Sequence, residues 1–188
     1  LLVYWAEETE GKTRQSRYLW ATLFAGIATL IKGPVGFLVP LLVSSAYLVV
    51  TGRGRHTRNF IRWPNVLLFL GVVLPWFVGL SLACPDFPYY GIMKESISRF
   101  TTTEFRRTQP PYYYLLIIAA CFFSWSAVLP SGLRFLVKAR ERLVRADWLF
   151  ICWAIGVVVF FSVSKSKLPG YILTGVIAMG VLVARVFA

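Results

Sequence analysis

Charged residues are scarce in this chain of 188 residues, and acidic residues are the scarcest. Only 15% of the residues are charged, against about 25% in a typical soluble domain, while 57% are hydrophobic. Lysine and arginine together number 20, and aspartate and glutamate only 8, so the formal net charge is +12. The apolar residues occur in long stretches, which excludes an ordinary soluble domain and indicates an α-helical membrane protein.

Histidine and cysteine are also rare. The three cysteines, Cys84, Cys121 and Cys152, form no CxxC or metal-ligand spacing, and His56 is the only histidine. A metal site is therefore not indicated, no cofactor is expected, and no Ser/His/Asp or Cys/His nucleophile set is visible. We expect His56, which lies in a basic loop, to be a solvated residue.

Six apolar stretches predict an all-α, polytopic transmembrane bundle. They cover residues 18–31, 35–50, 64–83, 112–130, 148–163 and 171–188. A full span takes about 20 residues, so the first two stretches are short. Only Lys32-Gly33-Pro34 separates them, and they could form two helices or one long broken helix. Glycine followed by proline favours a break between two helices.

The basic residues are distributed unevenly between the loops. Residues 7–17, 51–63 and 131–147, together with Arg185, contain 13 of the 20 lysines and arginines. The positive-inside rule assigns that side to the cytoplasm. The Lys32 turn, the loop 84–111 and the turn 165–170 are then predicted to lie outside. The positive charge lies in short loops and not on one continuous basic face, so nucleic-acid binding is not expected.

The outer loop is predicted to contain an amphipathic helix. From Tyr89, apolar residues recur with a helical period to Phe100, and Pro88 suits a helix start. Such a helix would lie on the outer leaflet. Glu95 and Arg99 are four residues apart and can form an ion pair on its surface.

Several residues on the predicted outer side can be interpreted either as ordinary residues of the interface and its loops or as ligands of a lipid phosphate. Lys32 is either a lysine that reaches back to the membrane interface or an ammonium that neutralises a lipid phosphate. Lys167 belongs either to a solvated loop or to the same phosphate site. Tyr171 is an interfacial aromatic or a hydroxyl donor to phosphate. Arg106 and Arg107 precede an aromatic run, and their guanidinium groups suit bidentate phosphate binding.

Several short motifs occur in an order that resembles a known family. They are Lys32-Gly33-Pro34, Leu74-Pro75-Trp76, Pro85-Asp86-Phe87, Glu95 to Phe100, Gln109 to Tyr114 and Lys167 to Leu173. This order resembles the bacterial aminoarabinose lipid A transferases, which belong with the protein O-mannosyltransferase-like GT-C glycosyltransferases. The resemblance implies a multi-pass enzyme of the bacterial inner membrane. Such an enzyme moves a sugar from a polyprenyl-phosphate carrier to an acceptor on the outer face.

The resemblance also implies roles for individual residues. Lys32 matches the lysine of the family's KGP motif, and Lys167 and Tyr171 match its KLPxY motif, where they would contact the carrier phosphate. Glu95 and Arg99 match its E-H-x-x-R-F stretch. Two family histidines are replaced, by Ser96 and Arg107, which leaves the acceptor open and weakens a metal-assisted reaction.

The family's catalytic aspartate lies upstream of every motif found here. We therefore expect residues 1–188 to form part of one transmembrane glycosyltransferase domain, without its N-terminal and C-terminal parts and without a catalytic residue. The acceptor could be lipid A, another glycolipid or, as in protein O-mannosyltransferases, a protein. The alternative from another class is a transporter or binder of polyprenyl-phosphate lipids.

Overall fold

The computed structural model describes residues 1–87, 89–91, 109–110, 112–123, 134 and 143–187. The described residues contain helices and connecting segments but no strand, which confirms the predicted all-α class for this part of the chain. The chain divides into two compact units, unit 1 (Leu1–Arg99) and unit 2 (Phe100–Ala188). Of the outer amphipathic helix predicted from Tyr89 to Phe100, residues 89–91 form a helical turn, and residues 92–100 lie outside the described residues.

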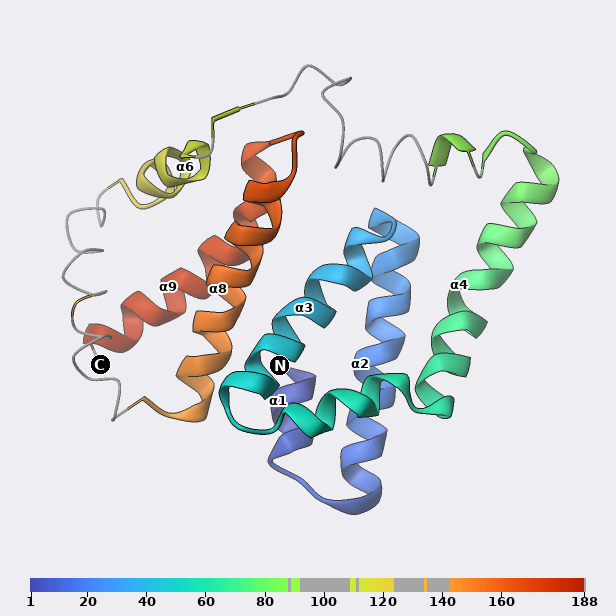
Figure 1. Cartoon of the computed structure of the whole chain (residues 1–188), viewed down its shortest axis with the longest axis horizontal. Helices are drawn as coiled ribbons and strands as arrows, with labels where there is room; N and C mark the ends of the chain where they lie inside the picture. Colours follow the sequence, from blue (N-terminus) through green and yellow to red (C-terminus); the bar gives the residue numbers. More distant parts are fainter. Residues whose placement is uncertain (88, 92–108, 111, 124–133, 135–142, 188) are drawn as a thin grey trace. The chain divides into compact units, whose positions relative to one another are not determined.

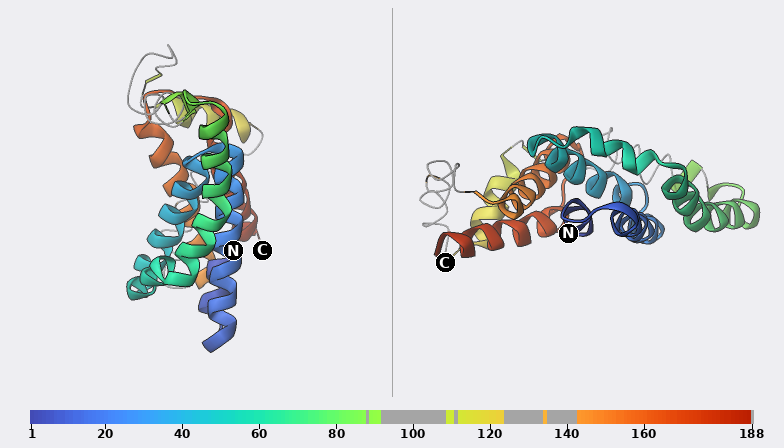
Figure 2. Two further views of the ribbon diagram at one scale, coloured as in Figure 1. Left: turned by 90° about the vertical axis from the view of Figure 1, so that its right-hand side faces the viewer. Right: turned by 90° about the horizontal axis from the view of Figure 1, so that it is seen from below.

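Unit 1 is built around two antiparallel helices, α2 (Gly11–Lys32) and α3 (Val35–Val50) (Figure 1, Figure 2). Its elements are α1 (Leu2–Glu7), α2 (Gly11–Lys32), α3 (Val35–Val50), the 3-10 helix η1 (Gly54–Ile61) and α4 (Trp63–Ala83). Helix α2 also packs against α4, where Gly26 lies close to the Val72 side chain. The predicted break after Lys32 is confirmed, because α2 and α3 are separate helices.

Two glycines make this helix pair geometrically feasible. Gly33 has φ 70° and ψ −161°, a backbone conformation that is essentially restricted to glycine, and its amide donates to the Thr29 carbonyl oxygen (2.8 Å). Gly36 lies against the backbone of α2, where an added Cβ would be 2.3 Å from the Ala28 carbonyl oxygen. The chain can therefore reverse direction within two residues and bring α3 against α2.

A buried carboxylate, that of Glu7, stabilises the end of unit 1 opposite the Gly33 turn. The Glu7 side chain is fully buried and accepts a hydrogen bond from the Tyr18 hydroxyl (2.8 Å). His56 Nδ1 lies 2.6 Å from Glu7 Oε2. Arg53 Nη1 lies 3.4 Å from that same oxygen. The expectation that His56 is a solvated loop residue is therefore wrong, because its ring is bound to a carboxylate 49 positions earlier in the chain.

Helix α4 presents its apolar side chains outward. Asn65 is its one buried residue, and it connects three elements by accepting from Gln15 Nε2 (3.4 Å) and donating to the Asn59 carbonyl oxygen (2.5 Å). The large apolar residues are exposed instead, among them Leu67, Leu74, Trp76 and Leu82. A polar interior contact and an apolar exterior fit a helix surrounded by lipid.

Unit 2 contains a second antiparallel helix pair. Its elements are α6 (Tyr113–Cys121), α8 (Arg145–Val163), the 3-10 helix η4 (Pro169–Ile172) and α9 (Leu173–Phe187). Asp147 in the first turn of α8 and Arg185 in the last turn of α9 lie 3.4 Å apart, Oδ1 to Nε. The Val144 amide also donates to Asp147 Oδ2 (3.0 Å). The contact between Asp147 and Arg185 places the start of α8 and the end of α9 together, as the predicted alternation of loops requires.

Two of the described helices are long and apolar enough to cross a membrane, Trp63–Ala83 and Arg145–Val163. Helix α3 and the segment Pro169–Arg185 are apolar but shorter. The predicted stretch 112–130 forms a helix of nine residues up to Cys121, and residues 124–130 lie outside the described part. The membrane-type, all-helical architecture is thus supported, whereas the count of six spans stays a prediction.

Candidate functional site

The loop after α8 contains a buried lysine. Ser164, Ser166 and Lys167 are only 3%, 2% and 9% exposed, although lysine is almost never buried unless it is paired. Within the described part of the chain, Lys167 has no ion pair and no hydrogen bond. A buried ammonium without a counter-charge is costly, so this position favours an anionic ligand.

Ser166 provides a second candidate donor beside it in the sequence. Its hydroxyl is buried and has no hydrogen-bond partner among the described residues. Ser164 differs, because its hydroxyl donates to the Ser166 carbonyl oxygen (3.1 Å). Ser166 is not among the site residues predicted from the sequence. In the sequence, Ser166 lies between two lysines directly after an apolar stretch. A polar loop at such a position is normally solvated, so the sequence alone does not predict that Ser166 is buried.

Two hydrogen bonds to the Leu168 carbonyl oxygen position the loop after α8. The Tyr114 hydroxyl of α6 donates to the Leu168 carbonyl oxygen (3.3 Å), and the Tyr171 amide donates to the same oxygen (3.1 Å). Tyr114 is 1% exposed, so it positions this loop and does not act as an interfacial aromatic. The Tyr171 ring packs against the Phe161 ring with their centroids 5.0 Å apart. A contact between the Tyr171 hydroxyl and a phosphate stays a prediction.

The other predicted site residues are placed as follows. Lys32 is exposed at the last residue of α2, directly before the Gly33 turn, and it belongs to unit 1, whereas Lys167 belongs to unit 2. Lys165 is exposed, in contrast to Lys167 two positions later. Glu95, Arg99, Arg106 and Arg107 lie outside the described residues and stay predictions. Across the described residues, no cluster of three or more His, Cys, Asp or Glu side chains could bind a metal ion.

Comparison with known proteins identifies relatives over nearly the whole chain, although no protein-family model matches it. The undecaprenyl phosphate-alpha-4-amino-4-deoxy-L-arabinose arabinosyl transferase 2 of Pseudomonas fluorescens is 27% identical over 186 residues, 97% of this chain and 31% of that protein. The corresponding transferase of Pseudomonas aeruginosa PAO1 is 30% identical over 177 residues, 92% of this chain and 32% of that protein.

A solved structure gives the same result. The crystal structure of ArnT from Cupriavidus metallidurans bound to undecaprenyl phosphate matches with a TM-score of 0.79 at 30% identity, over 94% of this chain and 32% of that chain. This chain resembles one segment of the aminoarabinose transferases. The apo form of the same ArnT matches with a TM-score of 0.74.

The resemblance inferred from the order of short motifs is therefore confirmed. It covers at least 92% of this chain in the relatives described above, but the chain spans only about a third of the length of those aminoarabinose transferases. Lys32, Lys167 and Tyr171 lie in the matched chain, and the structure adds that Lys167 is the buried one of the two lysines.

Proposed function

We propose that this chain is the carrier-binding part of an inner-membrane glycosyltransferase. The donor is a sugar linked to undecaprenyl phosphate, aminoarabinose by analogy with the relatives, and the acceptor is lipid A on the outer face of the membrane. The observation that carries the proposal is Lys167, a buried ammonium with no counter-charge in the described part of the chain. The similarity to an ArnT crystallised with undecaprenyl phosphate supports a phosphate as its ligand.

The reaction is a displacement at the anomeric carbon of the sugar. An acceptor oxygen forms the new bond, the bond to the carrier phosphate oxygen breaks, and the phosphate leaves with the electron pair. Negative charge increases on that phosphate in the transition state, and a fixed cation stabilises it there. Lys167 has this role, with Ser166 as a hydroxyl donor. A contact of Lys32 with the carrier phosphate stays a prediction from its motif. The acceptor proton passes to a general base outside this segment.

Transfer by the full natural chain is the direct test. The protein is reconstituted in liposomes with undecaprenyl-phosphate aminoarabinose and lipid A, and the lipids are analysed by mass spectrometry. We expect lipid A to gain one aminoarabinose, and heat-treated protein to give no product. Binding of the carrier without any transfer would support the transporter or binder instead. Transfer to a serine- or threonine-containing peptide in place of lipid A would support a protein O-mannosyltransferase-like enzyme.

The orientation gives a separate prediction. The charge distribution predicts that Lys32 lies outside and Arg55 in the cytoplasm, and both residues are exposed. The turn between α2 and α3 and the segment between α3 and α4 lie at opposite ends of unit 1 (Figure 1). Cysteine at position 32, in a protein whose native cysteines are replaced, should react with an impermeant thiol reagent in intact spheroplasts. Cysteine at position 55 should react only after lysis. Labelling of position 55 in intact spheroplasts, with position 32 protected, would reverse the assigned orientation.

A further inference from the structure

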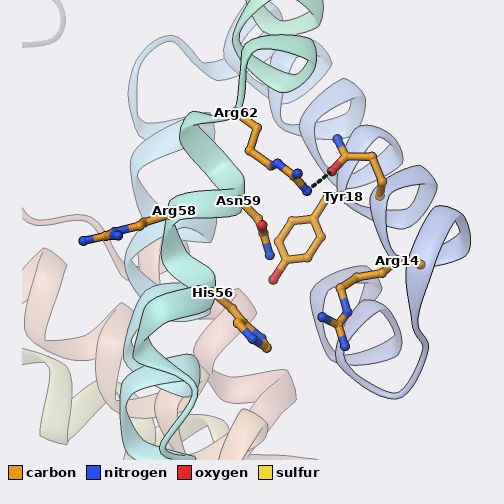
Figure 3. Close-up of a pocket in the computed structure, with 8 residues that line it drawn as sticks. Arg14, Tyr18, His56, Arg58, Asn59 and Arg62 are labelled. Carbon is orange, nitrogen blue, oxygen red and sulfur yellow. Dashed lines mark hydrogen bonds between the residues drawn. The ribbon is translucent and has the colours of Figure 1, made fainter.

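A basic pocket lies between the start of α2 and η1 (Figure 3). These segments lie at the end of unit 1 opposite the turn between α2 and α3 (Figure 1). It has a volume of about 480 Å³. Eight residues line it: Gly11, Arg14, Gln15, Tyr18, His56, Arg58, Asn59 and Arg62. They include three arginines and one histidine, and none of the eight is acidic. Its composition favours an anionic ligand, and none of its lining residues belongs to the Lys32 turn or to the loop that contains Lys167.

Two of these arginines are oriented but not neutralised. Arg62 Nη1 donates to Gln15 Oε1 (3.1 Å), and Arg14 Nε donates to the Thr9 carbonyl oxygen (2.9 Å). Both acceptors are neutral, and neither arginine has an ion pair within the described part of the chain. Arg53 and His56 differ, because Glu7 pairs with both. Arg14 and Arg62 therefore contribute positive charge to the pocket that no carboxylate neutralises among the described residues, and their planar forks suit phosphate oxygens.

An apolar groove adjoins the pocket. It has a volume of about 770 Å³, shares Gly11, Gln15 and Arg62 with the pocket, and is also lined by Lys12, Ile61, Trp63 and Pro64. Ile61 and Trp63 are 77% and 75% exposed. Trp63 is also the first residue of α4, whose outward apolar side chains fit a lipid environment. Tryptophan at the end of such a helix is typical of the membrane–water boundary.

We propose that the pocket and groove together bind an anionic phospholipid. Its phosphate lies between Arg14 and Arg62, and its acyl chains run past Trp63 and Ile61 along α4. A free phosphate ion would need the cations but not the adjoining apolar surface. The charge distribution assigns this end of unit 1 to the cytoplasm, and the cytoplasmic leaflet contains anionic lipids that attract basic residues at its surface.

The test measures lipid binding by the full natural chain, with phosphatidylglycerol added to the detergent-purified protein and followed by native mass spectrometry. One arginine near an anionic membrane surface is worth about 1 kcal/mol, so Arg14→Gln and Arg62→Gln should each weaken the tightest phosphatidylglycerol site about fivefold. The matched control is Arg55→Gln, which removes the same charge from an exposed position of η1 outside the pocket. It should change the affinity less than twofold.

A further variant and two further ligands distinguish the proposed lipid site from a loss of folding and from a site for small anions. Arg14→Lys retains the charge but not the planar fork, so it should keep part of the affinity that Arg14→Gln loses, which distinguishes lost binding from lost folding. Phosphatidylcholine, whose headgroup is neutral overall, should bind more weakly than phosphatidylglycerol. An equal loss in Arg14→Gln, Arg62→Gln and Arg55→Gln would overturn the site, as would an equal loss in Arg14→Lys. Inorganic phosphate that binds as tightly as phosphatidylglycerol would show a site for small anions and overturn the lipid proposal.

Discussion

Replacing Lys167 by alanine is expected to lower the rate of sugar transfer about 10²–10³-fold in the full natural chain, the effect of removing one fixed donor from a developing oxyanion in other enzymes. The physical reason is that the Lys167 ammonium is buried in the loop after α8 and has no counter-charge among the described residues. The leaving carrier phosphate would supply that counter-charge. The measurement is the initial rate of transfer in liposomes, normalised to the amount of protein in the membrane.

Lys165→Ala is the matched control for Lys167→Ala. Lys165 has the same side chain two positions earlier in the same loop, but it is exposed. Its replacement should change the rate less than about twofold, because an exposed charge is screened by water and salt. Lys167→Arg should recover only part of the rate, since a planar fork does not reproduce a compact ammonium. Equal rates in Lys165→Ala and Lys167→Ala would remove Lys167 from the site.

The second large effect is expected from Gly36→Ala. The new Cβ would lie 2.3 Å from the Ala28 carbonyl oxygen and 2.8 Å from the Thr29 amide nitrogen, so α3 must move away from α2. Backbone atoms form this contact and no side chain can rotate to relieve it. Overpacking of this kind costs about 1–3 kcal/mol, and we expect the upper end of that range. Thermal unfolding in detergent, followed by circular dichroism, measures the loss.

Gly71→Ala provides the comparison for Gly36→Ala. Gly71 lies inside α4, and a Cβ added there would meet no atom within 4 Å. Alanine is favoured over glycine in a helix by about 0.5–1 kcal/mol, so this variant should be as stable as the natural protein or slightly more stable. If Gly36→Ala unfolded at the same temperature as Gly71→Ala, the close contact between α2 and α3 would be contradicted.

Local patterns were sufficient to predict the helix break in unit 1. The proline ring restricts the backbone, whereas glycine, which has no Cβ, tolerates conformations that other residues rarely adopt, and Gly33 adopts such a conformation with a positive φ. The antiparallel pair in unit 2 was equally predictable, because the short polar loop after α8 separates two long apolar stretches.

Long-range contacts explain what the sequence analysis missed. Residues 7–17 were assigned to a loop because of their charges, yet α2 begins at Gly11. Contacts with residues about 50 positions away stabilise this region, including Glu7 with His56 and Gln15 with Asn65. The burial of Lys167 and Ser166 likewise depends on tertiary packing, including the contact of Tyr114 with Leu168. No local periodicity contains that information.

The most direct test of the central claim is a cryo-electron microscopy structure of the full natural chain with undecaprenyl phosphate. We predict that a phosphate oxygen lies about 2.7–2.9 Å from the Lys167 ammonium, the distance of a charge-assisted hydrogen bond. An ordered carrier phosphate bound elsewhere, with Lys167 paired to a protein carboxylate or turned into solvent, would contradict the account.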